Sequence, residues 1–456
     1  RAVCIMPNLK DPPKEFLGAR RALEELPFLE ILEDWMWYVK LSKWVLRCRI
    51  HIDVSAGSLI PTLTDWYVVV PPLYPRGDID IYPAKQGGIS STFQHQDHNS
   101  MGQLDLPWRE GKICVQTSLR LFEKRGYDQE PITSDARLSW HLYRAHEWLV
   151  AASQGNLAQP GDPFELPFVP RQPKRHIGFI EDSISYTNTW KTFEKSYGYA
   201  KLVQFGQHTD IQAIKSLYDS TEQELFQYHY GYKIEEYWTI ADLALWIKLK
   251  SVPVLPPWQI PMSLGELQTV LTQQGIDLKA LISHLSRRIR DGKRHLMLLG
   301  FPISNKIGEE AEFFHWFCFL LPKLTTGTVK GFRPIESTYK LQDEQKVLKD
   351  DVKLEWIKTS NWHSDEIGAR SRFSPSIRES KIAIIGAGAL GSCVAQLLVR
   401  AGINNVLLID HDLLEIGNLC RHTAAMIDIE RPKALSVMLA LNSISPHVRT
   451  NYIPKE

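Results

Sequence analysis

The stretch Lys381–Lys433 reads KIAIIGAGALGSCVAQLLVRAGINNVLLIDHDLLEIGNLCRHTAAMIDIERPK and decides the fold of the C-terminal part of the chain. Its first apolar run, Ile382–Ile385, is short and β-branched, as is typical of a buried parallel strand. A glycine turn and a helical pattern from Ser392 to about Ala401 follow, and a second apolar run ends in Asp410. The apolar residues that share one face of the expected helix are Val394, Leu397, Leu398 and Ala401. This order of elements predicts a Rossmann-like α/β fold.

The glycine turn predicts a bound nucleotide. Gly386, Gly388 and Gly391 let the backbone turn tightly and approach a phosphate, and the N-terminus of the helix offers free N–H groups and a positive dipole end. Asp410 is placed to accept a hydrogen bond from a ribose hydroxyl. The turn alone does not separate NAD from ATP, so an NAD-dependent Rossmann enzyme is the first alternative.

The residues after Asp410 favour ATP. Asn418 can hold a phosphate or ribose edge, and Arg421 and Lys433 are fixed cations near the turn. Such cations suit the charge that develops in nucleotidyl transfer better than they suit hydride transfer. The alternative is a solvated loop whose charges have no role.

The order Gly-x-Gly-x-x-Gly, Asp-x-Asp, Asn-Leu-x-Arg and Pro-Lys-Ala resembles the adenylation domain of ubiquitin-activating enzymes and of their bacterial relatives in molybdopterin and thiamin synthesis. The resemblance implies a phosphate turn at the three glycines, a ribose contact from Asp410, and ATP phosphate contacts from Asn418, Arg421 and Lys433, with Arg421 also catalytic. It implies magnesium as a cofactor, its main ligand lying beyond residue 456, and no metal ligand within the chain. His422 departs from the glutamine that this family often has.

The same resemblance predicts two features of assembly. Arg370 and Arg372 fall where the family often places an arginine that reaches the ATP of a partner subunit, although they can equally be surface residues without a role. The family forms homodimers through the adenylation domain, and the apolar stretch Leu435–Leu441 could contribute to such a surface.

The composition is that of an ordinary soluble protein of two or three domains, with 456 residues, 44% of them hydrophobic and 23% charged. The 53 Lys and Arg balance the 52 Asp and Glu, which gives no argument for direct nucleic-acid binding. Six scattered cysteines without a Cys-x-x-Cys pair argue against structural zinc and suit a reducing cytoplasm. No apolar run approaches the roughly 18 residues of a membrane span, and the missing initial Met and the abrupt end suggest a fragment.

The first 158 residues predict a small α+β domain. Helical patterns cover Lys14–Leu26 and Ser134–Ser153, and strand patterns lie between them. The expected strands are Val45–Val54, Trp66–Val70 and Ile79–Tyr82. A stiff turn at Tyr74-Pro75 and a long irregular loop, Gly87–Lys112, precede Cys114.

This order resembles ubiquitin-conjugating enzymes, which carry a Tyr-Pro pair, a His-Pro-Asn loop and a Gly-x-Ile-Cys nucleophile. Tyr74-Pro75 and Gly111–Cys114 match, whereas His95 and Asn99 only approximate the His-Pro-Asn loop. The resemblance implies that Cys114 carries an acyl group as a thioester and that Asn99, with His95, assists at the oxyanion. The alternatives are a buried core thiol at Cys114 and a conjugating-enzyme-like fold that only binds.

Between these ends, the proline-rich stretch Asn156–Pro173 marks an interdomain connection. The following region, up to about residue 360, predicts a mixed domain of strands with some helices. Its expected elements are the strands Ile240–Ile247, Leu296–Gly300 and Phe313–Leu321 and the helix Leu278–Ile289. We find no catalytic constellation in this region, and we expect His315 and Cys318 to be core or half-buried residues rather than ligands.

The chain is therefore expected to combine a conjugating-enzyme-like α+β domain (1–158), a mixed linker domain (159–365) and the first part of a Rossmann-like adenylation domain (366–456). This combination resembles bacterial fusion enzymes of CBASS anti-phage operons, which lie beside a cyclic-oligonucleotide synthase (CD-NTase). The resemblance implies adenylation of the C-terminus of that synthase, or of another ubiquitin-like protein, with ATP. Cysteine thioesters would then deliver it to an amine of a target protein or small molecule. We expect the full-length protein to be a cytoplasmic homodimer without a membrane partner, and the present fragment to lack complete adenylation activity.

Overall fold

The computed structural model describes residues 11–55, 57–115, 130–170, 175–204, 210–231, 239–326, 336–369 and 373–455. Arg370 and Arg372 lie outside the described residues, as does Cys4. The chain forms two compact units. The first comprises Arg1–Pro170 together with Pro253–Pro261 and Ser304–Glu310, and the second comprises the remaining segments.

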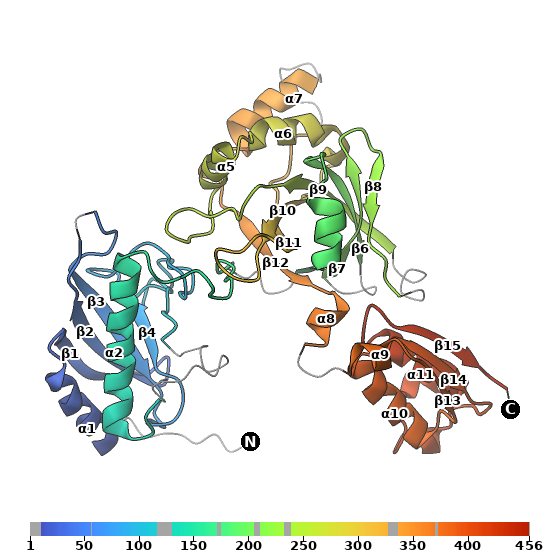
Figure 1. Cartoon of the computed structure of the whole chain (residues 1–456), viewed down its shortest axis with the longest axis horizontal. Coiled ribbons are helices and arrows are strands. Elements are labelled where there is room, and N and C mark those ends of the chain that lie inside the picture. The colour runs from blue at the N-terminus through green and yellow to red at the C-terminus, as the bar shows by residue number, and fades with distance from the viewer. Residues whose placement is uncertain are drawn as a thin grey trace. The chain divides into compact units, whose positions relative to one another are not determined.

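The first unit is built on an antiparallel meander with strand order β1-β2-β3-β4, and two helices lie across one face of this sheet (Figure 1). Its elements are α1 (Lys14–Ala22), η1 (Leu23–Glu25), β1 (Leu29–Tyr38), β2 (Lys43–His51), β3 (Leu63–Val70), β4 (Asp80–Pro83) and α2 (Ser134–Ser153). Alternate residues of β2, such as Leu46 and Cys48, join the helices in the core, as the period of two in a strand requires. The predicted helices and strands are thus confirmed within a few residues, but β1 was not predicted.

The opposite face of this meander is covered by the loop that leads to Cys114. Trp108 is buried there against Tyr67 and Val69 of β3 and Val45 of β2. The aromatic rings of Tyr67 and Trp108 lie 5.3 Å apart between centroids. A small apolar core therefore fixes the long loop against the sheet. Cys114 follows directly after this fixed loop.

The second unit begins with a mixed sheet of eight strands in the order β5-β12-β11-β10-β9-β6-β7-β8. Because β5 pairs with β7 as well as with β12, seven of these strands close into a ring. The strands are β5 (His176–Phe179), β6 (Tyr197–Gln204), β7 (Ile211–Asp219), β8 (Glu224–Gln227), β9 (Thr239–Lys248), β10 (Leu296–Ile303), β11 (Phe313–Leu320) and β12 (Glu355–Asn361). The helical elements are α3 (Ser183–Ser185), η3 (Tyr186–Trp190), α5 (Leu264–Gln273), α6 (Leu278–Leu285), η4 (Ser286–Ile289), α7 (Glu336–Gln342) and η5 (Asp343–Val347).

This barrel confirms the three predicted strands and the predicted helix of the middle region. Cys318 is fully buried and His315 is partly buried beside the rings of Phe179 and Phe301, which confirms their predicted place in or near the core. The barrel core also holds the carboxyl group of Glu181, which is 1% exposed. Its hydrogen-bond donors are the side chains of Ser185, Trp190, Tyr228 and Trp316.

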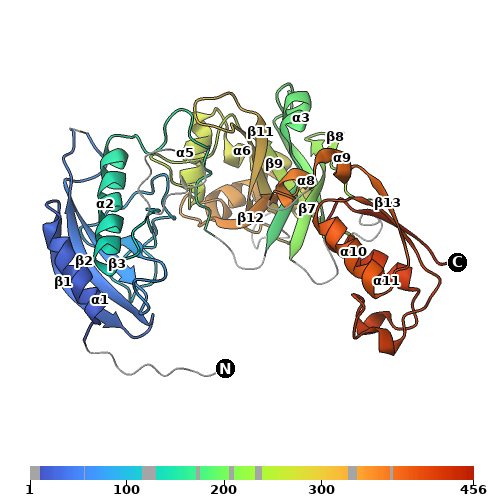
Figure 2. The same cartoon turned by 60° about the horizontal axis from the view of Figure 1, so that its bottom comes forward.

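The C-terminal part of the second unit has three parallel strands in the order β13-β14-β15, with α10 and α11 packed on one side of the sheet (Figure 2). Its elements are α8 (Ser364–Ile367), α9 (Pro375–Arg378), β13 (Lys381–Ile385), α10 (Ala389–Arg400), β14 (Asn405–Ile409), η6 (Ile416–Asn418), η7 (Met426–Asp428), α11 (Lys433–Asn442) and β15 (Arg449–Ile453). This order of parallel strands and helices confirms the Rossmann-like fold.

Two expected apolar faces are corrected by the structure. In α10 the buried residues are Ser392, Ala395 and Val399, whereas Leu397 is 67% exposed. The helix starts earlier than expected, at Ala389, and its small residues let it approach the sheet. In α11, Val437, Met438 and Leu441 are buried in the core of their own domain, so most of the stretch expected to form a dimer surface is occupied internally. Within the described segments, no helix is long and apolar enough to span a membrane.

Candidate functional site

The glycine turn after β13 has the tight geometry that a phosphate-binding turn requires. Gly386 has φ +88°, in the left-handed region, and its N–H donates to the carbonyl of Ile409 at 2.8 Å. Gly391 lies in the first turn of α10, where an added Cβ would meet the Gly386 carbonyl oxygen at 1.8 Å. Gly388 is the N-cap residue of α10, no side chain caps the helix, and no atom would meet a Cβ within 4 Å there. The first N–H groups of α10 therefore face an uncrowded position.

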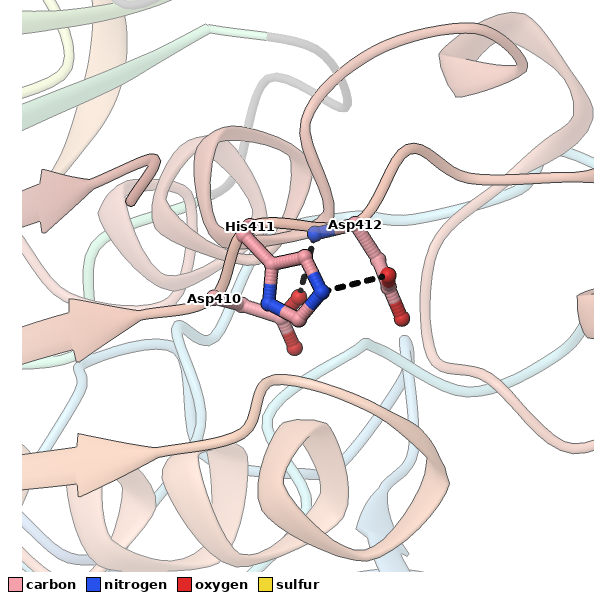
Figure 3. A group of neighbouring side chains, drawn as sticks. All are labelled: Asp410, His411 and Asp412. Atoms are coloured by element: carbon pink, nitrogen blue, oxygen red, sulfur yellow. Dashed lines mark hydrogen bonds and ion pairs between the residues drawn. The ribbon is translucent and has the colours of Figure 1, made fainter. Parts of the chain in front are cut away.

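Asp410 connects this turn to the end of β14 through hydrogen bonds. Its Oδ2 accepts a hydrogen bond from the Ala387 N–H at 2.6 Å, and its Oδ1 accepts one from the Asp412 N–H at 2.8 Å. Figure 3 shows the Asp410 carboxylate with its hydrogen bond to the Asp412 N–H and with the side chains of His411 and Asp412 beside it. A carboxylate has about four lone-pair sites, so both oxygens can still accept a ribose hydroxyl.

The cation of Lys433 is fixed near the same strand end. Its Nζ lies 2.8 Å from Asp412 Oδ2, and its backbone N–H donates to the Asp412 carbonyl at 2.9 Å. This ion pair lowers the pKa of the Asp412 carboxyl. Lys433 is also the first residue of α11, so its side chain is held at a helix start.

Asp410, His411 and Asp412 are the described residues whose ligand atoms lie close enough, within 4.8 Å of one another, to meet at a metal ion. The fit to magnesium is poor, because this ion prefers oxygen ligands in octahedral geometry. Here one donor is an imidazole, and Asp412 already pairs with Lys433. These three residues therefore do not form a magnesium site.

The segment with Asn418 and Arg421 is held against the glycine turn by His422. The Ala424 N–H donates to Nδ1 of His422 at 3.0 Å, so in the neutral ring Nε2 carries the hydrogen. That Nε2–H donates to the Ala387 carbonyl at 2.7 Å. His422, which departs from the family pattern, thus links the segment directly to the turn.

Asn418 and Arg421 differ in how far their side chains are already engaged. Asn418 Oδ1 accepts a hydrogen bond from the Glu415 N–H at 3.0 Å, which closes a short capping box. The side chain of Arg421 is exposed and makes no hydrogen bond or ion pair with the described residues. The structure thus brings the three glycines, Asp410 and the Asn418–Arg421 segment together, and it leaves Arg421 as a cation available to an anion.

Cys114 lies at the end of a short antiparallel ladder between the long loop and the segment 111–114. Gln96 pairs with Ile113, and the Cys114 N–H donates to the His95 carbonyl at 2.8 Å. Ile113 and Val115 are buried while Cys114 is exposed. His95 and Cys114 are therefore adjacent across this ladder, and His95 departs from strand geometry with φ +56°.

The other described cysteines divide into two groups. Cys48 and Cys318 are buried, and burial raises the pKa of both thiols. Cys393 and Cys420 are exposed. Exposure alone therefore does not distinguish Cys114 from Cys393 and Cys420 as the candidate acyl carrier, but its position beside His95 does.

His95 is held by a carboxylate that the sequence did not reveal. Its Nδ1 lies 2.9 Å from Glu165 Oε2, and its backbone N–H donates to the same oxygen at 3.1 Å. This contact with Glu165 raises the pKa of the His95 imidazole. Glu165 belongs to the proline-rich stretch 156–173, whose composition pointed only to a connection between domains.

Asn99 supports the loop from within. It is 2% exposed, and its Nδ2 donates to the carbonyls of Ile89 and Ser91 at 2.9 and 3.0 Å. Its Oδ1 accepts a hydrogen bond from Arg109 Nε at 3.0 Å. A Cβ on Gly111 would meet Asn99 Oδ1 at 2.5 Å, which explains the glycine at that position. Both amide hydrogens are engaged here, so the expected oxyanion contact of Asn99 stays a prediction.

Comparison with known proteins relates most of the chain to one bacterial protein. The model of the Cap2 central linker domain matches residues 155–362, and the ThiF family model matches residues 365–456. The ATP-dependent ubiquitin transferase-like protein Cap2 of Enterobacter hormaechei subsp. hoffmannii is 33% identical over 442 residues, which are 95% of this chain and 73% of that protein.

Two further relatives match over shorter stretches. Molybdopterin-synthase adenylyltransferase of Haemophilus influenzae is 36% identical over 80 residues, or 17% of this chain and 32% of that protein. Sulfur carrier protein ThiS adenylyltransferase of Bacillus subtilis is 41% identical over 75 residues, or 16% of this chain and 22% of that protein.

Proposed function

Because this chain belongs to the Cap2 family of ATP-dependent ubiquitin transferase-like proteins, we propose that it activates a protein C-terminus with ATP and passes it through Cys114 to an acceptor amine. Membership of this family confirms the resemblance to the bacterial fusion enzymes. The ThiF match and the similarity to two adenylyltransferases support the activation step. They also disfavour the alternative of an NAD-dependent enzyme.

One observation carries the activation step. Ala387, just before the uncapped N-terminus of α10, is hydrogen-bonded to Asp410 and to His422. His422 belongs to the segment that carries the exposed cation of Arg421, so the helix N-terminus and this segment meet at one residue. Helix N-terminal N–H groups bind phosphate oxygens, and an arginine stabilises the charge that grows on the α-phosphate. The attacking group is the carboxylate of the protein substrate, and pyrophosphate leaves, so the product is an acyl-adenylate. Asp410 would hold the ribose, and Asn418 and Lys433 would contact the phosphates.

In the transfer steps, Cys114 is the acyl carrier. The acyl group reaches its thiolate as a thioester, and an amine then displaces the sulfur to form an amide. His95 lies opposite this cysteine, and Asn99 holds the loop that positions both. The N-terminal unit thereby acts as a conjugating enzyme, in line with its Tyr74-Pro75 pair and its Gly-x-Ile-Cys turn.

The proposal also covers partners. The activated C-terminus would come from a CD-NTase or from another ubiquitin-like protein, and the acceptor would be an amine of a target protein or a small molecule. Conjugation of a CD-NTase would prime cyclic-oligonucleotide signalling in anti-phage defence. Magnesium would accompany ATP, and the protein of full family length would be a homodimer in the cytoplasm. The resemblance of the fusion architecture supports these points.

Cysteine substitution in a protein of full family length tests the proposal. We expect Cys114→Ala to leave adenylate formation intact and to abolish ligation to the acceptor. We expect Cys114→Ser to accumulate an oxyester, because an alkoxide leaves far less readily than a thiolate. Cys393→Ala and Cys420→Ala are matched controls, since both thiols are also exposed. Mass spectrometry should find the acyl group on the peptide with Cys114, and normal ligation by Cys114→Ala would refute the carrier role.

The alternative of a purely binding domain is tested by thiol reactivity. An acyl carrier needs an accessible thiol that forms a thiolate readily. We therefore expect iodoacetamide to alkylate Cys114 faster than a cysteine in a free peptide. An equal or slower rate would favour the binding alternative.

A further inference from the structure

A cavity of about 260 Å³ lies beside His95 within the first unit. Its polar walls include His95, Glu165 and Asp162, and its apolar walls include Phe164, Trp258 and Ile307. The rings of Phe164 and Trp258 meet edge to face with centroids 6.1 Å apart. The volume is below the roughly 300–1,000 Å³ of sites for drug-sized ligands, so the cavity suits a single side chain.

Four segments that are distant in the sequence build this cavity. The loop 304–310 joins the proline-rich stretch, because the Phe164 N–H donates to the Asn305 carbonyl at 3.1 Å and the Ile307 N–H donates to the Asp162 carbonyl at 2.8 Å. The segment 253–261 joins the long loop, because the Trp258 N–H donates to the Thr92 carbonyl at 3.1 Å. The walls are therefore hydrogen-bonded to one another, and two of them come from between the strands of the barrel region.

The cavity is also next to the proposed acyl carrier. His95 lines it, and the same residue accepts the hydrogen bond from the Cys114 N–H at 2.8 Å. Because this bond joins the two residues directly, Cys114 lies one hydrogen bond away from a wall of the cavity. A group that fills the cavity past His95 can therefore reach a thioester on Cys114.

The lining selects the chemistry of the occupant. Two carboxylates, Asp162 and Glu165, face one imidazole, so the lining disfavours an anion and favours a cation. Aromatic rings accept both an alkyl chain and an ammonium group, the latter through the negative face of the ring. A primary amine on an unbranched alkyl arm matches these walls and this volume.

We propose that this cavity is the acceptor site of the first unit, and that it binds the alkylamine arm of a lysine-like acceptor with its nitrogen directed past Glu165 and His95 to Cys114. This inference rests on the proposed function, in which Cys114 carries the acyl group. The bound ammonium group first gives one proton to the Glu165 carboxylate. The neutral amine nitrogen then bonds to the thioester carbonyl carbon, the carbon–sulfur bond breaks, and the second proton that the nitrogen loses ends on the Cys114 sulfur. No oxidant or further reactant is needed.

Chemical acylation tests the site without knowledge of the natural acyl donor. In a chain with Cys4, Cys393 and Cys420 replaced by alanine, Cys114 is acetylated with S-phenyl thioacetate. Its deacylation is then followed by mass spectrometry with three nucleophiles. N-acetyl-lysine methylamide carries the alkylamine arm, alanine amide offers only an α-amine, and hydroxylamine is too small to need the cavity.

Two variants address the site in different ways. Glu165→Gln removes the charge but keeps an oxygen that can accept the His95 N–H, and Ile307→Phe fills the cavity without touching that contact. We expect each to slow deacylation by the lysine derivative about tenfold or more, as for a lost charged hydrogen bond, and to change the hydroxylamine rate less than twofold. For Ile307→Phe we expect the lower deacylation rate to arise because a higher amine concentration is needed for half-saturation. Glu309→Gln on the same loop, which lies outside the cavity lining, is the matched control.

The outcomes separate the two claims. In the parent chain, we expect the lysine derivative to react faster than alanine amide. Equal rates, or an equal loss with hydroxylamine in correctly folded variants, would overturn the acceptor site. A Cys114 that cannot be acetylated at all would instead count against the proposed function, because an acyl carrier must accept this group.

Discussion

Arg421 is set on a rigid backbone and has an unoccupied guanidinium group. Its N–H donates to the Asn418 carbonyl at 3.0 Å, and its side chain has no partner among the described residues. We expect Arg421→Ala to weaken ATP binding by about 1.5–3 kcal/mol, the range for hydrogen bonds to charged groups. Titration calorimetry on a protein of full family length would measure this loss. Arg431→Ala is the control, because Arg431 pairs with Asp428 at 2.9 Å, and equal affinity in both variants would contradict the assignment.

The buried carboxyl group of Glu181 makes the stability of the protein depend on pH in a defined direction. Burial raises the pKa of its carboxyl to about 7, despite the hydrogen bonds that it accepts. A raised folded-state pKa gives stability that is present below the unfolded value of 4.5 and is lost as the pH rises through about 7. The difference corresponds to roughly 3 kcal/mol. We therefore expect Glu181→Gln to become more stable relative to the parent chain as the pH rises from 5 to 8.5.

Urea unfolding at these two pH values, followed by tryptophan fluorescence, would measure the change. The comparison between variant and parent matters, because partly buried histidines such as His176 have a lowered pKa and act in the opposite direction. Glu355→Gln is a suitable control, since the Glu355 side chain is 42% exposed and pairs with Arg294. A difference between Glu181→Gln and the parent that does not vary with pH would refute the buried-charge account.

At the scale of elements, the junction of β13 and α10 holds one closely packed glycine and one with open space beside it. Gly391→Ala places a Cβ 1.8 Å from the Gly386 carbonyl oxygen, so we expect a loss of stability of about 1–3 kcal/mol, as for overpacking. Gly388→Ala meets no atom within 4 Å, so we expect unchanged stability but weaker ATP binding. Thermal unfolding and calorimetry together would distinguish the two, and a stable Gly391→Ala variant would contradict the close packing.

Local patterns explain which elements could be predicted. The strands β13 and β14 and the helix α2 have continuous apolar runs or clear helical periodicity, and they were found within a few residues. The strand β1 was missed because two register shifts, on either side of Glu33, break its alternation. The closure of the barrel was also missed, because the pairing of β5 with β7 depends on contacts that no local pattern encodes.

The residues of the candidate sites also divide into those that a local motif reveals and those that only the folded chain brings together. The glycines, Asp410, Asn418 and Arg421 lie within one short stretch, so their spacing was informative. Glu165, Trp258 and Ile307 come from three separate segments and have no motif in common. Only the folded chain brings them to His95. His422 was visible in the sequence as a departure, but its hydrogen bond to Ala387 required the structure.

At the scale of the whole molecule, the first unit depends on segments that follow it in the sequence. Among the described residues, a chain that ends at Pro170 loses four backbone hydrogen bonds, which are those of Thr92, Gly161, Asp162 and Phe164 to the two later segments. At about 0.5–1.5 kcal/mol each, these bonds contribute on the order of a few kcal/mol. We expect the truncated chain to unfold at a lower temperature than the same unit within the whole chain. Scanning calorimetry would show this, and an unchanged transition would indicate that the two later segments contribute nothing.

The interleaving of segments also constrains how such proteins can diverge. The backbone leaves and re-enters the first unit at residues 170, 253, 261, 304 and 310, so no single crossover point separates it from the rest. Recombination that exchanged only the first 170 residues between relatives would pair one parent's Glu165 with another parent's Trp258 and Ile307. Productive exchanges must carry residues 1–170, 253–261 and 304–310 together. Substitutions in the proline-rich stretch should therefore covary with substitutions in the segments 253–261 and 304–310.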